Sequence, residues 1–286
     1  MSDLTVIIPV WNNYQRFLER ALASIREQKN DCEVLIYDNG SETPICLSEV
    51  DTGELRVRVL RSETTCDLGK ARNKALDEVN TDFVCFHDVD DLLLPGALSF
   101  AMAEHHRRFL ASVALQSLCT DGHGHYWRIP SPFWQPLAHH IRAALIWRTL
   151  ESNLLAFGGG CVLRSACVRA AGGFADLSYG EEMPLNIALA IRWPCRWYRR
   201  FGRLYVVREG SLWHRELSHE EIIVMHETRL RRLDDYNSIQ ATVWRARLRQ
   251  RAQRQLKNGV SNTATPGKEI PVSLGLRTWI DEQLRT

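Results

Sequence analysis

The chain has 286 residues, of which 45% are hydrophobic and 24% charged, and its formal net charge is +2. These values are typical of a globular protein with a sizeable core, and they exclude a disordered chain or one whose overall charge would attract nucleic acid. The eight cysteines form no CxxC pair, and no apolar stretch reaches membrane-spanning length. The first residues carry no signal-peptide pattern. We therefore expect a cytoplasmic protein, attached at most peripherally to a membrane.

Strand and helix patterns alternate through the first half of the chain. Continuous apolar, β-branched runs predict buried strands at 4–10, 32–37, 55–60 and 83–86. Apolar residues at helical spacing predict helices at 17–25, 68–79 and from Pro95 to about Arg108. This order predicts an α/β fold with a mostly parallel sheet and helices on both faces.

The second half is less regular. It predicts strands at 113–118, 156–163 and 204–207 and helices at 164–171 and 181–191. From residue 218 an arginine-rich pattern predicts one long helix to about 256, followed by a linker and a last helix over 273–284. We expect a main domain over 1–217 and a helical extension over 218–286.

The strand predicted at 83–86 ends in an acidic cluster, Asp88, Asp90 and Asp91. Ligands of open α/β sheets bind beyond the carboxyl ends of the strands. Crowded carboxylates repel one another unless a cation neutralises them, and Mg²⁺, Mn²⁺ and Ca²⁺ prefer carboxylate oxygen. The cluster therefore predicts a divalent-metal site for an anionic substrate such as a diphosphate. The alternative is a helix start at Leu92, which would explain one acid better than three.

Several short motifs occur together in one order. They are VIIPVWN at 6–12, YDNGS at 37–41, LGKARN at 68–73, DVDD at 88–91, GGF at 172–174 and GEE at 180–182. In this order they resemble a family 2 glycosyltransferase with the GT-A fold, over roughly residues 4–215. The resemblance implies a GT-A catalytic domain over 1–217 that transfers a sugar, with inversion, from a nucleoside-diphosphate sugar and with help from Mn²⁺ or Mg²⁺.

The resemblance also implies where the nucleotide binds. Asp38 would accept the ring N–H of a uracil, and the backbone at Pro9, Val10 and Trp11 would meet the other edge of the base, which favours a UDP-sugar. The alternative is that Asp38 only stabilises the turn at 38–41, because Asp and Asn often bond their own backbone.

The other residues that the resemblance assigns to the sugar donor belong to the acidic cluster or are expected near it. Arg72 would reach the diphosphate or the acids, since a guanidinium makes paired bonds to such oxygens. Asp88 and Asp90 would bind the metal, Asp91 would support them or touch the sugar, and His214 is a candidate third metal ligand.

Inversion requires a base on the face opposite the leaving group. The family's base is usually the second acid of a Glu-Asp pair that opens a helix after GGF, and here the pair is Glu181-Glu182. We assign Glu182 as the base and Glu181 as its support. The extra methylene of Glu182 allows a shifted acceptor position. The alternative is that both acids only offset the helix dipole.

Two other functions stay open. A nucleotidyltransferase would carry a Gly-rich basic loop after the first strand, where this chain has Trp11-Asn12-Asn13. A binding module without chemistry would be consistent with Glu182 in place of Asp. The sequence does not specify the acceptor, which could be a glycan, a lipid-linked saccharide, a peptide or a small molecule. It also leaves open the oligomeric state and the role of the arginine-rich helix, which could contact anionic lipid.

Overall fold

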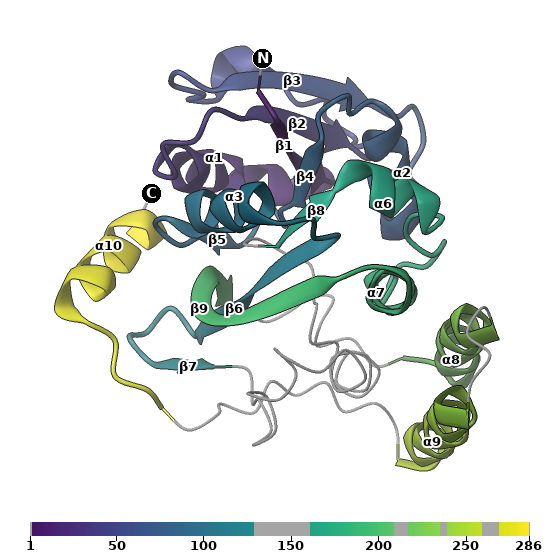
Figure 1. Ribbon diagram of the computed structural model, residues 1–286. Coiled ribbons are helices and arrows are strands. Elements are labelled where there is room, and N and C mark those ends of the chain that lie inside the picture. The colour runs from purple at the N-terminus through teal and green to yellow at the C-terminus, as the bar shows by residue number, and fades with distance from the viewer. Residues whose placement is uncertain (1, 129–160, 209–216, 235–238, 259–268, 286) are drawn as a thin grey trace.

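The computed structural model describes residues 2–128, 161–208, 217–234, 239–258 and 269–285. Within these ranges the chain forms a curled mixed sheet with helices packed around it (Figure 1). Hydrophobic clusters fill both faces of the sheet.

The N-terminal half of the sheet is parallel, as expected. It contains β1 (Leu4–Val10), β2 (Glu33–Asp38), β3 (Arg56–Arg61) and β4 (Phe83–Phe86) in the order β3-β2-β1-β4. Strands β1 and β4 are buried along their whole length, which is why their sequences are continuously apolar rather than alternating.

The other half of the sheet is mixed. It adds β8 (Val162–Arg164), β6 (Ser112–Thr120), β9 (Cys195–Val206) and β5 (Leu92–Leu93), while β7 (Tyr126–Arg128) pairs with β6. The first part of β9 and the short strands β5 and β7 were not predicted. Because Leu92 begins a strand, the helix-start interpretation of the acidic cluster is wrong.

Helices cover both faces of the sheet. One face carries α1 (Leu18–Arg26), which follows a 3-10 helix over Asn12–Phe17, and α3 (Ala97–Arg107). The other face carries α2 (Leu68–Asp77), α6 (Ser165–Ala170) and α7 (Glu182–Arg192). A short 3-10 helix, η2 (Leu47–Glu49), lies between β2 and β3.

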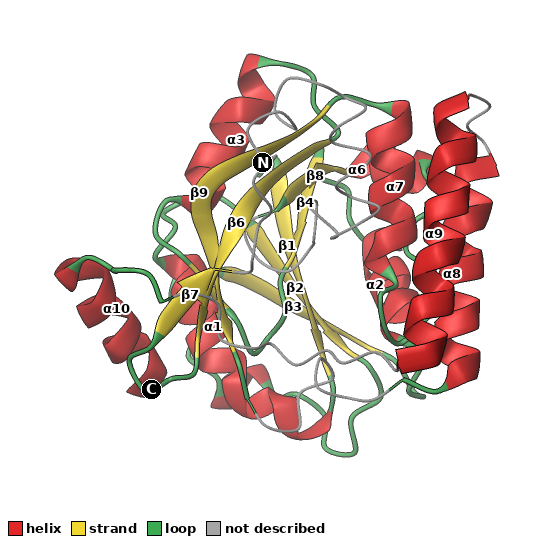
Figure 2. Cartoon of the chain, turned by 90° about the horizontal axis from the view of Figure 1, so that it is seen from below, coloured by secondary structure: helices red, strands yellow, loops and turns green. Residues whose placement is uncertain are grey.

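The prediction of one long C-terminal helix is wrong. The segment forms two helices, α8 (His219–Asp234) and α9 (Ile239–Asn258), which lie side by side next to α7 (Figure 2). Leu233, Trp244 and Leu248 are buried in the same hydrophobic cluster as α7. Folding back buries these side chains, and a single straight helix would expose most of them.

The last helix, α10 (Leu274–Arg285), confirms the helix expected there, but it lies on the opposite side of the molecule from α8 and α9 (Figure 2). Its Ile280 is fully buried against Tyr126 and Leu204. Residues 217–285 therefore pack against the sheet domain at two separate places, and the boundary at 217/218 stays a prediction. None of the described helices has the length and apolar character needed to cross a bilayer.

Candidate active site

The parallel strands bring the predicted nucleotide residues together at one edge of the sheet. Val10 is paired with Asp38 in the register of β1 and β2, and the Asn39 N–H donates to the Val10 carbonyl at 2.9 Å. Pro9 and Val10 are buried, whereas Trp11 is 46% exposed. The edge thus presents a large aromatic side chain beside buried backbone.

The Asp38 carboxylate is fully buried and bonded within the protein. Its Oδ1 accepts the Ser41 N–H at 2.9 Å, and its Oδ2 pairs with Arg61 Nη1 at 2.5 Å. These contacts are the ones expected if Asp38 stabilises the turn. Recognition of uracil by Asp38 therefore stays a prediction.

Arg72 joins two parts of the predicted site that are far apart in the sequence. Its Nη2 donates to Asp88 Oδ1 at 2.6 Å, its Nη1 donates to Glu181 Oε1, and only 4% of the residue is exposed. Burial acts to lower the pKa of Arg72, but Glu181 and Asp88 outweigh it, so the pKa lies above its usual value. The guanidinium stays charged and fixes both acids.

A second buried arginine, Arg203 on β9, completes a chain of alternating charges. Its Nη1 lies 3.2 Å from Asp91 Oδ2 and 3.6 Å from Asp88 Oδ2. Burial raises the pKa of Asp91, Arg203 opposes the rise and Asp88 adds to it. Asp88 therefore lies between two guanidiniums, and Asp91 is held below the surface, where it supports its neighbours.

Asp90 points to a different partner. Its carboxylate pairs with Arg208, and its carbonyl accepts Arg20 Nη2 at 2.9 Å. The Arg208 guanidinium lies 4.1 Å from the ring centroid of Phe17. Side chains of Asp88 and Asp90 are 30% and 20% exposed, so both remain within reach of solvent.

The two glutamates differ in burial. Glu181 is 3% exposed, and burial and the neighbouring Glu182 raise its pKa, against the opposing effect of Arg72. Glu182, the first residue of α7, is partly exposed. Of the pair, only Glu182 is in a position to meet an acceptor from solvent.

Sequence reasoning missed Arg61, Arg203 and Arg208. The only sequence signal was that each lies at or near the end of a strand, where the site was expected. Their partners Asp38, Asp91 and Asp90 were identified, but nothing local shows which arginine meets which acid. His214, the candidate metal ligand, lies outside the described residues.

The carboxylates of Asp88 and Asp90 suit a hard divalent cation that would also bind a substrate. No group of three or more His, Cys, Asp or Glu side chains is arranged for a metal ion in the part of the chain that the structure describes. Asp88 and Asp90 nevertheless offer two partly exposed carboxylates close in sequence, the oxygen ligands that Mn²⁺ and Mg²⁺ accept when phosphate oxygens complete the shell.

Solved structures support the fold. The chain is similar to Staphylococcus aureus TarS residues 1–349 in complex with UDP-GlcNAc, with a TM-score of 0.71 and 19% identity, over 88% of this chain and 72% of that one. The GT-A-type α/β fold expected from the sequence is thereby confirmed.

Curated relatives match part of the chain. O-antigen biosynthesis protein RfbC of Myxococcus xanthus is 34% identical over 125 residues, which are 42% of this chain and 10% of that protein. The GalNAc(5)-diNAcBac-PP-undecaprenol beta-1,3-glucosyltransferase of Campylobacter jejuni is 33% identical over 106 residues, 36% of this chain and 34% of that protein. The poly(ribitol-phosphate) beta-N-acetylglucosaminyltransferase TarS of S. aureus is 32% identical over 114 residues, 37% of this chain and 20% of that protein.

The matched segments thus span about a third or less of these relatives. The model of glycosyl transferase family 2 matches residues 5–166, which hold β1 to β4 and the acidic cluster and make up more than half of the chain. The chain therefore belongs to glycosyl transferase family 2.

Proposed function

We propose that this chain is a metal-dependent inverting glycosyltransferase that moves a sugar from a UDP-sugar to an acceptor nucleophile. The observation that carries the proposal is the double contact of Arg72 with Asp88 and Glu181. It holds the end of β4, where a donor diphosphate is expected, against the start of α7, where the base is expected. Binding of donor and activation of acceptor would then occur on one rigid unit.

The donor would lie along the edge formed by β1, β2 and β4. The uridine would meet Pro9, Val10 and Trp11, with Asp38 as the acid nearest the base. TarS, which shares the fold, binds UDP-GlcNAc, and this supports UDP as the nucleotide. Arg72 is the proposed contact to the diphosphate, and Asp91 is proposed to support the sugar side.

Asp88 and Asp90 would hold Mn²⁺ or Mg²⁺, with His214 as the proposed third ligand. When bound, the ion would neutralise charge on the departing nucleoside diphosphate. Asp90 would have to exchange its contact with Arg208 for this role, and the released guanidinium would lie beside an anionic substrate.

Glu182 is the proposed base. Its carboxylate takes the proton from the acceptor hydroxyl while the acceptor oxygen bonds to the anomeric carbon and the bond to the diphosphate oxygen breaks. UDP leaves with the bonding electron pair, and Glu182 later gives its proton to solvent. Glu181 stays paired with Arg72 and keeps the start of α7 in place.

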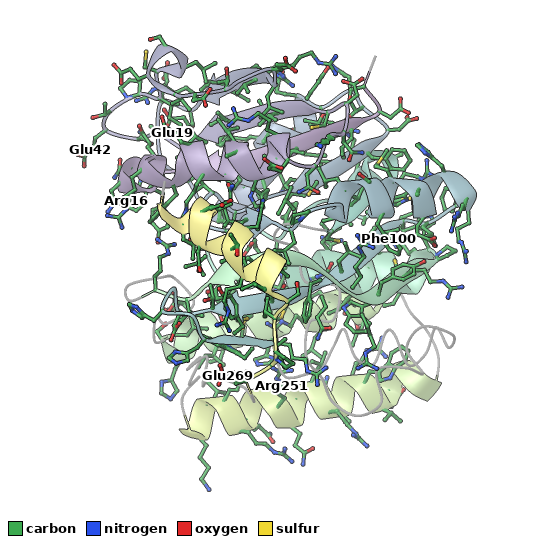
Figure 3. All side chains as sticks on the ribbon, turned by 90° about the vertical axis from the view of Figure 1, so that its left-hand side faces the viewer. Arg16, Glu19, Glu42, Phe100, Arg251 and Glu269 are labelled. Atoms are coloured by element: carbon green, nitrogen blue, oxygen red, sulfur yellow. The ribbon has the colours of Figure 1, made fainter. Side chains whose placement is uncertain are left out.

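The acceptor is proposed from the relatives only as a class, a saccharide or saccharide-bearing molecule. A cytoplasmic protein with peripheral membrane contact would meet lipid-linked saccharides. Helix α9 favours such contact, since it carries basic residues and no acidic one. Figure 3 shows α9 at one edge of the molecule, with side chains projecting away from the body.

The proposal is tested with purified protein, a panel of UDP-sugars and Mn²⁺, with UDP release as the measurement. We expect turnover that chelation with EDTA abolishes, and a loss of at least about a hundredfold in Asp90→Ala, because the charge on the leaving group is no longer neutralised. Asp51→Ala is the matched control, since Asp51 is 69% exposed and its contacts, with Arg26 and the Gly53 N–H, lie at the surface.

Other outcomes select another function. Full activity in Asp90→Ala would remove the proposed metal role. Release of pyrophosphate from a nucleoside triphosphate would identify a nucleotidyltransferase. Tight binding of a UDP-sugar without turnover, across a broad set of acceptors, would identify an inactive binding module.

A further inference from the structure

The start of α7 is packed against a buried arginine that belongs to the C-terminal helices. Arg229 on α8 is 2% exposed. A Cβ added at Gly180, two residues before Glu182, would lie 3.3 Å from Arg229 Nη2 and 3.3 Å from Met225 Sδ. Because Gly180 has a φ of +66° and carries no side chain, the guanidinium can approach the turn that opens α7.

The surroundings of Arg229 are unfavourable to its charge. Burial and the nearby Arg251 lower the pKa of Arg229 to about 10, while Glu182 and Tyr179 oppose the decrease. Its Nε has no hydrogen-bond partner among the residues that the structure describes. Figure 3 shows Arg251 on the side of α9 that faces the rest of the molecule. A buried guanidinium in such surroundings lowers the stability of the fold, because its pairing only partly offsets the loss of hydration.

One turn before Arg229 on α8, His226 adds no positive charge beside it. His226 is 2% exposed, and burial and Arg229 lower its pKa to about 4, so the ring is neutral near pH 7. Its Nε2 lies 2.5 Å from Gln255 Oε1 on α9, and it donates there. On this side of α7, Glu182 is thus the acid whose charge favours the buried guanidinium.

We infer that Arg229 is a positioning residue for Glu182, so that α8 and α9 complete the active site. Arg229 packs against the turn that opens α7 and thereby directs the Glu182 carboxylate toward the acceptor, while Arg72 restrains the neighbouring Glu181. The inference rests on the proposed role of Glu182 as base. Among the described residues, Arg72, Glu181 and Arg229 interact electrostatically with Glu182, while Asp88, Tyr179, His226 and Arg251 interact with these three.

The test compares Arg229→Met, Arg229→Lys and the control Arg231→Met, which changes a residue on the same helix whose side chain is 78% exposed. UDP release from UDP-GlcNAc with Mn²⁺ is measured from pH 5 to pH 9, together with UDP affinity and the melting temperature. We expect kcat of Arg229→Met to fall roughly tenfold to a hundredfold, because a misdirected base loses most of its effect.

Two further readouts separate positioning from a structural role. In Arg229→Met the loss should fall on kcat, while UDP affinity is unchanged and the melting temperature is equal or higher, since a neutral side chain replaces a poorly solvated charge. Arg229→Lys should recover part of kcat. Wild-type kcat in Arg229→Met would overturn the inference, as would a loss that follows the melting temperature in both variants.

Failure of the proposed function gives a different result. Wild-type turnover in Glu182→Gln would show that Glu182 is not the base. If Glu182→Gln loses turnover while Arg229→Met keeps full activity, only the positioning role of Arg229 is overturned. If UDP-GlcNAc is not turned over, NMR of the carboxyl carbons in protein with ¹³C-labelled glutamate tests the positioning role of Arg229. The signal of Glu182 is the one that Glu182→Gln lacks. The chemical shift of this signal should change in Arg229→Met and stay constant in Arg231→Met, and an unchanged chemical shift in Arg229→Met would overturn the positioning role.

Discussion

Gly69 lies directly against the backbone of Ala175, so that a Cβ at position 69 would be 1.8 Å from the Ala175 carbonyl oxygen. The same glycine donates its N–H to the Leu177 carbonyl at 3.1 Å. This contact docks the first turn of α2 against the segment that leads to Glu181. It thereby allows Arg72, one turn later, to reach both Glu181 and Asp88.

We expect Gly69→Ala to lower the free energy of unfolding by about 3 kcal/mol or more, because the methyl group meets rigid backbone. Gly275→Ala on α10 is the control, since a Cβ there meets nothing within 4 Å. It should leave stability unchanged or raise it by up to about 1 kcal/mol. Denaturant unfolding measures both, and equal stability of the two variants would contradict the close approach.

Arg72→Met should destabilise the fold by about 3–5 kcal/mol, because it leaves the buried Glu181 without its partner. The double variant Arg72→Met with Glu181→Gln should recover part of this loss, since no uncompensated charge remains at Glu181. Urea unfolding of the two single variants and the double variant gives the coupling. Additive effects would mean that the pair does not interact as the structure has it.

The protein should lose stability as the pH falls from about 6.5 toward 4, in part through His105. Burial lowers the pKa of His105 to about 4, and its Nε2 lies 2.9 Å from the Val162 carbonyl. The unfolded chain takes up this proton at higher pH than the folded chain, so protonation favours unfolding between these values. The loss from this residue is about 3 kcal/mol at pH 4.

Urea unfolding at pH 7.5, 6, 5 and 4 measures this dependence. His105→Gln keeps a donor for Val162 and should show a smaller decrease across the series. His106→Gln is the control, since His106 is exposed on the same helix, and it should follow the wild type. Identical slopes in both variants would remove His105 as a source of acid sensitivity.

Helix α9 should bind anionic membranes. Its basic residues, with no acid among them, are Arg245, Arg247, Arg249, Arg251, Arg254 and Lys257. Each basic residue near an anionic surface contributes about 1 kcal/mol at low salt. We expect sedimentation with vesicles that contain phosphatidylglycerol, little with pure phosphatidylcholine, and release by 0.5 M salt, where the Debye length is only a few ångströms.

Arg247→Glu with Arg254→Glu should abolish this binding, because both residues are exposed on α9. Arg199→Glu with Arg200→Glu reverses two exposed charges on β9 and should bind like the wild type. Binding that the α9 variant retains would exclude this helix as the contact. Binding to RNA but not to vesicles would assign the basic face to nucleic acid.

The N-terminal sheet could be predicted because its information is local. A parallel strand that is buried on both faces must be continuously apolar, so β1, β2 and β4 are visible as runs. Strands β5 and β7 are too short to show a period, and they exist only because β9 and β6 pair with them. The separation of α8 and α9 was missed because the arginine-rich pattern resumes after residue 238, and the arrangement follows from the packing of Leu233, Trp244 and Leu248 in the cluster that contains α7.

The sequence by itself determined which acids are candidates for the site, because Asp88, Asp90, Asp91, Glu181 and Glu182 stand next to predictable strands and helices. Only the tertiary structure decided which cation each acid meets. Arg203 on β9 and Arg208 just after it meet Asp91 and Asp90, from which they are more than a hundred positions away in the sequence. A guanidinium has no local pattern that identifies its partner, since long-range pairing follows from sheet order and helix packing rather than from spacing along the chain.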